Sequence, residues 1–493
     1  MPSRTRLLYH RLTGSGERTI DRDLELAITE FAPGSEKTKD KVIHRSIGFT
    51  APLRQQSRNR NSWVPLSNNP LLYKMWMMRC KACGYTATLQ IQANENSCPI
   101  CGQLNDERGT FNQFQIAIPQ AFRTDLSRGY DAKEDSDTFR GIPAALVEHA
   151  GIQPTNLANT NCVTSLSSDA RVWRINDNAG RLFEGTVCQT PPPPTDKDRI
   201  QGIPQIQNQC IDIRFLKNAS PSPTDKIALA AGKTTEVLRI APEAVPSGVN
   251  IDPFHKQSRG SVRAAIISAT FLLQRIIADR LDIEPEEIEV ANISRRVLAD
   301  QSIVAEMILS DRLPNGAGFV SWTRTNFATI LRDACEGRSA FTSGIMQSTH
   351  LAACDSSCYD CLKVYRNMAY HGLLDWRLAL SYLKILNDLA YRSGLDGIFT
   401  APELGGWLRT AELLRDNFTN YFNYENISWG NLLGFKAGQQ KVIVTHPFWD
   451  TINPQGILAE AAAAAGGEVA YIDTFNLLRR PGWCRAQLAE LEL

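Results

Sequence analysis

The spacing of hydrophobic positions separates a strand-rich first half of the chain from a second half in which helices and strands alternate. Residues 41–49, 111–118 and 171–176 alternate apolar and polar side chains, and this two-residue period predicts strands. A proline tract at 191–194 cannot enter a sheet interior, so it marks an exposed loop or linker. We therefore expect a β-rich first half.

The second half changes its hydrophobic period near residue 258. Residues 261–281 place apolar side chains at helical spacing, which predicts a helix packed on a core. Near the end of the chain, two buried strands at 441–444 and 468–472 flank an alanine-rich helix at 457–465. This order is that of a βαβ unit, so the second half is expected to be α/β.

Four cysteines form the sharpest chemical signal in the chain. They are spaced as two C-x-x-C pairs, Cys80-Lys-Ala-Cys83 and Cys98-Pro-Ile-Cys101. Each pair presents two sulfurs to one metal ion, and Gly84 and Gly102 permit the tight turn that follows. Four sulfur ligands leave no open coordination position for water or substrate, so we expect a closed, structural zinc site.

A second cysteine cluster lies at Cys354, Cys358 and Cys361. Three thiols within eight residues predict a second zinc ion, for which the fourth ligand is open. Cys335 ranks first for this position, and His350 and His371 compete with it because imidazole nitrogen also binds zinc. The isolated cysteines are expected to be packed or free thiols: Cys162, Cys188, Cys210 and Cys484.

These patterns together predict an α/β (α+β) protein with several parts. A chain of 493 residues exceeds the size of one hydrophobic core, so two or three domains are expected. We divide the sequence into an N-terminal mixed segment (1–74), a zinc ribbon (75–120), a β-rich region (121–254) and a C-terminal zinc-binding α/β domain (255–493).

Composition restricts the kinds of partner. The net charge is +1, so the chain as a whole offers no bulk attraction to nucleic acid or membranes, and any polyanion must be held by a local patch. Twelve cysteines with knuckle spacings, no apolar leader after Met1 and no apolar run near eighteen residues predict a cytoplasmic protein without a membrane partner.

One arginine-rich stretch is a candidate for DNA contact. Arg54, Arg58 and Arg60 alternate with amide side chains in a loop that ends at Trp63, a mixture suited to phosphate contact and base stacking. A solvated linker would have the same composition, so both readings stay open. The pairs at 295–296 and 479–480 are further candidates.

The chain lacks recognisable nucleotide-hydrolysing machinery. Residues 232–235 read Gly-Lys-Thr-Thr, but a phosphate loop needs a glycine five residues earlier, where Ile227 stands. We read 234–240 as a strand preceded by a turn. No Asp-Glu-x-His box follows an apolar strand, so any ATPase is expected to belong to a partner.

Three carboxylates near the C-terminal strands raise a nuclease alternative. Asp450, Glu460 and Asp473 could gather magnesium, but they lack the spacing of a D…E-x-K site. His446, which follows the first of these strands, reads as a strand end rather than a general base. We therefore assign no catalytic residues.

The run from Cys354 to Trp376 resembles the zinc-binding domain of MrfA-type DNA repair helicases, most closely its version in the DrmB family of the DISARM phage-defence system. Residues 261–288, 313–319 and 30–34 agree with this family in order, so the likeness touches most of the chain, sparsely. Helicase relatives pack all four cysteines closely, which keeps the assignment of Cys335 open. The chain also begins near the segment at 30–34 without an upstream motor.

The resemblance implies a role. In that family the four-cysteine site is a folding element attached to a superfamily-two motor, and DrmB works beside a separate helicase subunit, DrmA. We accordingly expect a non-catalytic, zinc-binding accessory subunit that holds two structural zinc ions, associates with a DrmA-like superfamily-two DNA helicase and assists DNA binding in phage defence. The alternatives are an accessory subunit of a DNA repair helicase and a metal-dependent DNA hydrolase.

Overall fold

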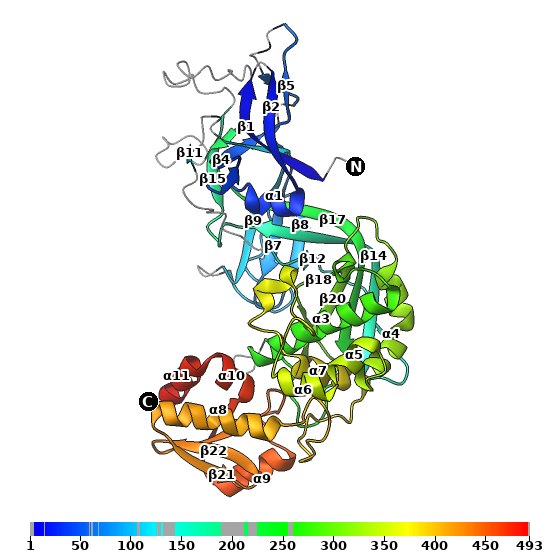
Figure 1. Ribbon diagram of the computed structural model, residues 1–493, viewed down its shortest axis with the longest axis vertical. Helices are drawn as coiled ribbons and strands as arrows, with labels where there is room; N and C mark the ends of the chain where they lie inside the picture. The colour runs from blue at the N-terminus through cyan, green and yellow to red at the C-terminus, as the bar shows by residue number, and fades with distance from the viewer. Residues whose placement is uncertain are drawn as a thin grey trace. The chain divides into compact units, whose positions relative to one another are not determined.

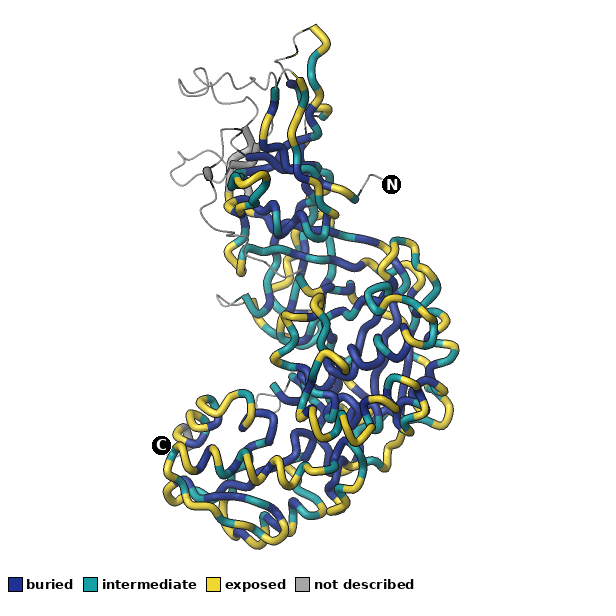
Figure 2. The backbone as a smooth tube through the Cα atoms, in the orientation of Figure 1, coloured by how far each residue is buried: buried dark blue, intermediate teal, exposed yellow. Residues whose placement is uncertain are grey.

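The computed structural model divides the chain into two compact units (Figure 1). The first unit comprises Met1–His149 and Arg171–Lys233, and the second comprises Ala150–Ala170 and Thr234–Leu493. Within these ranges the structure describes residues 4–13, 15–58, 60, 63–67, 69–105, 109–124, 126, 130–131, 143–188, 212–214, 224–254 and 260–491. Figure 2 shows the buried stretches of backbone in dark blue inside each unit.

The four segments expected from the sequence stay a prediction, and the two units group residues by their contacts alone. Two of the three unit boundaries fall inside long strands, β14 (Cys162–Asn176) and β17 (Thr224–Pro242), and the third lies between His149 and Ala150. The expected zinc ribbon lies within the first unit. Its strands β7 (Leu71–Cys80) and β9 (Phe111–Pro119) pair from Leu71↔Pro119 to Cys80↔Phe111, so the cysteines lie at the end of a sheet of the first unit.

The first unit consists mainly of strands. Besides β7, β9 and the parts of β14 and β17 that it contains, its elements are β1 (Thr5–Thr13), β2 (Gly16–Asp23), α1 (Leu24–Glu30), β3 (Glu36–Lys39), β4 (Val42–Thr50), β5 (Leu53–Gln55), β6 (Trp63–Pro65), β8 (Thr86–Leu89), β10 (Ala121–Thr124), β11 (Tyr130–Asp131), β12 (Leu146–Val147), β15 (Phe183–Cys188) and β16 (Asp212–Arg214). The strands predicted at 41–49, 111–118 and 171–176 are confirmed as β4, β9 and the end of β14.

Two sheets organise this unit. One has the strand order β11-β4-β10-β1-β2, and Phe31, Phe49 and Phe122 meet edge to face in its core. In the other, β9 pairs antiparallel with β7 and parallel with the start of β17. The arginine-rich stretch belongs to a small hairpin, β5–β6, in which Leu53 pairs with Pro65.

The turn expected before Thr234 is absent, because β17 runs without interruption through Gly232 and Lys233. A Cβ atom at Gly232 would lie 2.4 Å from the ring of Trp173, which is itself buried. Glycine is therefore required at this position by the close approach of an aromatic ring to the backbone. The Gly-Lys pair belongs to a packed strand and not to a phosphate-binding loop.

The second unit mixes helices and strands, which confirms the α/β expectation for this half. Besides its parts of β14 and β17, its elements are β13 (Thr155–Asn156), α3 (Ser261–Leu281), η1 (Pro285–Glu287), β18 (Ile288–Val290), β19 (Ser294–Val297), β20 (Ile303–Asp311), α4 (Phe319–Cys335), α5 (Ala340–Ile345), α6 (Ser348–Ala353), η2 (Tyr365–Tyr370), α7 (Trp376–Asn387), α8 (Trp407–Phe422), β21 (Glu425–Trp429), β22 (Leu432–Ala437), β23 (Gln440–Thr445), α9 (Gly456–Ala465), β24 (Val469–Asp473), α10 (Thr474–Arg479) and α11 (Pro481–Leu491).

Helix α3 is the centre of the larger core of this unit. It spans the predicted residues 261–281, packs against α4, α5 and α7, and buries nearly all of its side chains. Among the described residues it is also the helix long and apolar enough to cross a membrane, with an eighteen-residue window of mean hydropathy 1.4. Arg263, Arg275 and Arg280 interrupt this helix, so its longest stretch without a charged side chain is shorter than eighteen residues. Since 89% of the window is buried, a core helix explains its composition.

The predicted βαβ unit is confirmed near the C-terminus. Strands β23 and β24 pair in parallel from Lys441↔Val469 to Thr445↔Asp473, and α9 connects them. They belong to a four-stranded sheet with the order β21-β22-β23-β24, on which α8 and α9 pack. This sheet has a hydrophobic cluster of its own, built around Phe418, Phe435 and Val442.

Candidate metal centres

The first cysteine group is held by two turns of the same geometry. In each turn the first cysteine accepts a hydrogen bond from the glycine four residues later, Gly84 N–H to Cys80 O and Gly102 N–H to Cys98 O, both at 2.9 Å. Both glycines adopt a left-handed backbone, with φ of +78° and +71°. Glycine reaches this region without the strain that a Cβ atom would add, so the Cys-x-x-Cys-Gly pattern fixes the knuckle locally.

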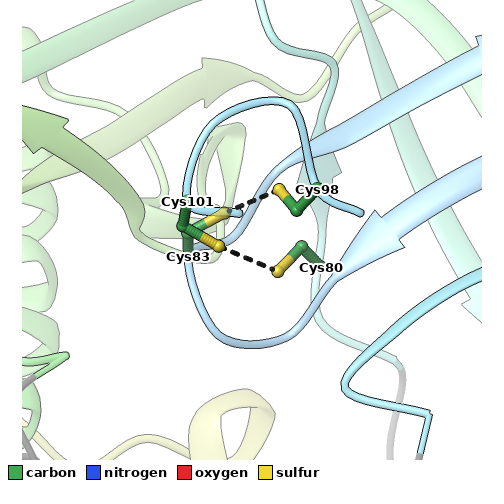
Figure 3. A group of neighbouring side chains, drawn as sticks. All are labelled: Cys80, Cys83, Cys98 and Cys101. Atoms are coloured by element: carbon green, nitrogen blue, oxygen red, sulfur yellow. Dashed lines mark hydrogen bonds between the residues drawn. The ribbon is translucent and has the colours of Figure 1, made fainter. Parts of the chain in front are cut away.

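The four sulfurs of this group converge on one point (Figure 3). The Sγ atoms of Cys80 and Cys101 lie 3.6 Å apart, as do those of Cys83 and Cys98. A tetrahedral ion with Zn–S bonds of about 2.3 Å requires sulfurs roughly 3.8 Å apart. The observed separations fit that requirement, and the cysteines are buried except for Cys101, which is half-buried.

Hydrogen bonds and burial give these thiols different pKa values. The hydrogen bond with Cys83 lowers the pKa of Cys80 to about 5, and the same hydrogen bond raises the pKa of Cys83. Burial raises the pKa of Cys101 to about 11. A dication that attracts four thiolates would remove this competition, because it stabilises every ionised sulfur at once.

The second group is assembled by the end of a short helix and the loop after it. His350 lies on α6, Cys354 follows the last residue of that helix, and Cys358 and Cys361 lie in the loop. The loop forms a knuckle in which the carbonyl of Cys358 accepts hydrogen bonds from the backbone N–H groups of Cys361 (3.3 Å) and Lys363 (2.9 Å). The four ligand atoms of His350 and the three cysteines all lie within 4.8 Å of one another.

The geometry of this group also fits one tetrahedral ion. Cys361 Sγ lies 3.9 Å from Cys354 Sγ and 3.7 Å from Cys358 Sγ. His350 Nε2 lies 3.5 Å from Cys358 Sγ, close to the spacing of about 3.6 Å that standard Zn–S and Zn–N bonds require. His350 Nδ1 lies 2.9 Å from the carbonyl of Ile345, which can only accept a hydrogen bond, so Nδ1 carries the proton and the lone pair of Nε2 would be available to an ion.

The buried Trp376 holds the metal-ligand loop in place through hydrogen bonds. Its indole Nε1–H donates to Cys354 O (3.2 Å), and its backbone N–H donates to Ser356 O (2.8 Å). The ring also contacts His350 edge to face, with centroids 5.6 Å apart. Such contacts orient the ligands before metal binding, and they explain how the helix-starting residues at the end of the Cys354–Trp376 run serve the site.

The ranking of Cys335 as fourth ligand is corrected: the structure brings His350 to the three cysteines instead. Cys335 ends α4 and packs into the large core, where burial raises the pKa of its thiol to about 12. His371 is not in the group either, since its Nε2 contacts Val364 O (3.0 Å) and Asn367 Oδ1 (2.9 Å). The signal for His350 was its position four residues before Cys354, at the spacing that places two side chains on one side of a helix.

Both donor sets fit zinc. Thiolate and imidazole are ligands that zinc favours, and in each group four protein atoms fill a tetrahedron. The first ion would be held by Cys80, Cys83, Cys98 and Cys101, and the second by His350, Cys354, Cys358 and Cys361. Each ion would cross-link segments of the chain through four protein ligands, which is the chemistry of a structural site.

The arginines proposed for DNA contact differ in their exposure. Arg54, Arg58 and Arg60 are exposed along the β5–β6 hairpin, while Trp63, which ends the stretch, is buried and does not offer a stacking surface. We call these three residues the hairpin arginines. In the other two pairs one arginine contacts a polar side chain of this chain: Arg296 Nη1 lies 3.6 Å from Glu306 Oε1, and Arg479 Nη2 donates a hydrogen bond to Ser356 Oγ. Contact with DNA stays a prediction for all of them.

The carboxylates of the nuclease alternative do not form a metal-binding group among the described residues. The Asp473 carboxylate caps α10 and accepts hydrogen bonds from Asn476 N and Nδ2. Asp450 accepts from the backbone of Ile452 in a turn. His446 is buried, and burial lowers its pKa to about 3, which suits a packed, neutral imidazole at the strand end.

The remaining cysteines are partly covered by the described residues. Cys162 and Cys484 are fully buried, and burial raises their pKa values, as expected for packed thiols. Cys210, the side chain of Cys188 and the proline tract at 191–194 lie outside the described residues.

No protein-family model matches the chain. The chain is similar to the Druantia protein DruE. DruE comes from Escherichia coli (strain UMEA 4076-1), and the two sequences are 22% identical over 394 residues. The matched region covers 76% of this chain and 20% of DruE, so the chain spans about a fifth of that relative's length. A crystal structure of the DUF1998 helicase MrfA bound to DNA aligns with a TM-score of 0.34 and 11% identity, over 78% of this chain and 34% of MrfA.

Proposed function

We propose that this chain is a non-catalytic, zinc-stabilised module that works with a superfamily-two DNA helicase in defence against phages. The observation that carries the proposal is the similarity to DruE, a protein of an anti-phage system, across most of this chain. It favours phage defence over DNA repair as the setting. The DISARM assignment, with a DrmA-like helicase as partner and the cytoplasm as compartment, rests on the family resemblance of the Cys354–Trp376 run.

The chemistry of the two metal groups supports a structural role. Each supplies four protein ligands, so a bound zinc ion would keep no position for a water molecule to be activated. The Gly-Lys pair lies in a continuous strand, so the described residues offer no phosphate loop at that position either. Hydrolysis of ATP is accordingly assigned to the partner, and this chain is assigned the task of holding DNA or the motor in position.

The test is co-expression with a candidate partner, a superfamily-two DNA helicase. The two proteins should copurify, and the ATPase rate of the helicase on single-stranded DNA should rise when this chain is added. A variant that lacks the second ion, Cys358→Ser, should lose the stimulation, whereas Cys162→Ser, which removes a cysteine outside both groups, should keep it. A helicase that neither binds this chain nor changes its rate contradicts the proposal. DNA cleavage by this chain alone in the presence of magnesium would support a hydrolase instead.

A further inference from the structure

The surface beside the second metal group carries aromatic side chains that face solvent. Tyr359, between the ligands Cys358 and Cys361, is 67% exposed, and Tyr365, on η2, is 66% exposed. Met368 on the same short helix is 41% exposed. Exposed apolar side chains that form a contiguous patch mark a place where another molecule binds, whereas single ones are ordinary.

The aromatic residues belong to one continuous surface. The ring of Tyr359 meets the ring of His371 edge to face, with centroids 5.8 Å apart. His371 Nε2 in turn lies 3.0 Å from the carbonyl of Val364, whose peptide bond leads into Tyr365. These contacts join the knuckle that carries Tyr359 to the start of η2, where Tyr365 lies, through His371 at the end of that helix. We call Tyr359, Tyr365 and His371 the knuckle face.

The knuckle face is held rigidly by the residues beneath it. Tyr359 lies inside the metal-ligand loop, and its backbone is fixed by the hydrogen bonds to the carbonyl of Cys358. Asn367 is buried, accepts a hydrogen bond from the backbone N–H of Val364 (3.0 Å) and donates to Leu362 O (2.8 Å), which fixes the start of η2. Rigid aromatic side chains lose little conformational entropy when a planar partner stacks on them.

Basic side chains flank the knuckle face. Arg366 is exposed beside Tyr365, and Lys363 is half-buried two residues before it. The segment from Tyr359 to His371 contains these two cations and one acidic residue, Asp360, so its formal charge is +1. Aromatic rings interleaved with cations match the bases and phosphates of an unpaired strand, whereas a duplex hides the faces of its bases.

We propose that the knuckle face binds single-stranded DNA, with bases stacked on Tyr359 and Tyr365 and phosphates contacted by Lys363 and Arg366. This inference deepens the proposed function, on which it rests, by assigning the form of DNA and a contact surface in the second unit. It is distinct from the hairpin arginines, which offer charge without an exposed ring.

The experiment measures binding of the full zinc-loaded chain to fluorescein-labelled oligothymidylate of twenty nucleotides by fluorescence anisotropy. The double variant Tyr359→Ala/Tyr365→Ala should bind at least about tenfold more weakly, because each stacked base contributes about 1–3 kcal/mol. Tyr359→Phe/Tyr365→Phe keeps the rings and should bind within about twofold of the parent. Tyr421→Ala removes a tyrosine that is 82% exposed on α8 and serves as the matched control.

Two further measurements separate stacking from loss of structure. Tyr365→Ala alone lies beyond the last cysteine, so it should weaken binding while the zinc content stays unchanged. Lys363→Gln/Arg366→Gln should lower the salt dependence of log K by about 1.4, the value for two phosphate contacts on a single strand. The inference is overturned if the parent does not bind the oligonucleotide, or if the double alanine variant binds as well as Tyr421→Ala. Stimulation of the helicase could persist in either case, which distinguishes this failure from failure of the proposed function.

Discussion

Replacement of His350 by alanine tests the assignment of the second metal group. His350 supplies one of four ligand atoms, and its Nε2 lies 3.5 Å from Cys358 Sγ. Binding of structural zinc releases about 10–16 kcal/mol in small zinc domains, so one ligand in four corresponds to roughly 3–4 kcal/mol. At about 1.4 kcal/mol per factor of ten, His350→Ala should weaken zinc binding at this site roughly 10²- to 10³-fold.

The assay is competition with a chromophoric chelator, which reports the amount of zinc released at each chelator concentration. The four-cysteine group serves as an internal reference, because all its ligands lie in the first unit. His350→Ala should release one ion per chain at low chelator concentration and the other at high chelator concentration. His350→Cys restores a fourth ligand of another type and should shift the early release back toward that of the parent.

The matched control is Cys335→Ser. Cys335 is buried in the core at the end of α4, so the change should cost about 1 kcal/mol of folding free energy while both ions are retained. The reasoning is refuted if Cys335→Ser releases an ion early and His350→Ala does not. That result would mean that the chain path around α6 differs from the one described here.

Four other changes have defined outcomes. Gly102→Ala has space for its methyl group but requires φ of +71°, so it should destabilise the knuckle by about 1 kcal/mol, measured as earlier zinc release on heating. Lys384 Nζ lies 2.8 Å from both carboxylate oxygens of Glu403. Glu403→Gln should lower the free energy of unfolding, measured in urea, by about 2–3 kcal/mol, and the double variant Lys384→Met/Glu403→Leu should recover part of this loss. Burial lowers the pKa of His446 to about 3, so below about pH 6.5 the unfolded chain binds a proton that the folded chain does not. The free energy of unfolding should therefore fall by about 1.4 kcal/mol per pH unit between pH 6 and 4. His446→Gln should remove this slope. Reversal of charge at the hairpin arginines should lower the salt dependence of DNA binding and leave the melting temperature unchanged, because these side chains are exposed.

Features that depend on neighbouring residues could be predicted from the sequence. The first cysteine group follows from the spacing of Cys80 to Cys101, because each knuckle is closed by hydrogen bonds that span only a few residues. Helix α3 and the βαβ unit followed from hydrophobic period for the same reason: the pattern that buries a face is written within the element itself.

Features that depend on distant contacts could not. Gly232 looked like part of a turn because nothing near it in the sequence announces the ring of Trp173. The choice between Cys335 and His350 depends on how α4, α5 and α6 pack, and periodicity does not give that path. Two of the three unit boundaries lie inside β14 and β17, where the strand pattern continues, so no change of composition marks them in the sequence.

The account depends most directly on the metal content of the chain. Elemental analysis of the purified protein, with protein concentration measured by amino-acid analysis, should give two zinc ions per chain, and both should leave only as the chain unfolds. A folded chain that contains no zinc, or that loses both ions to a chelator and keeps its melting temperature and its stimulation of the helicase, would contradict it.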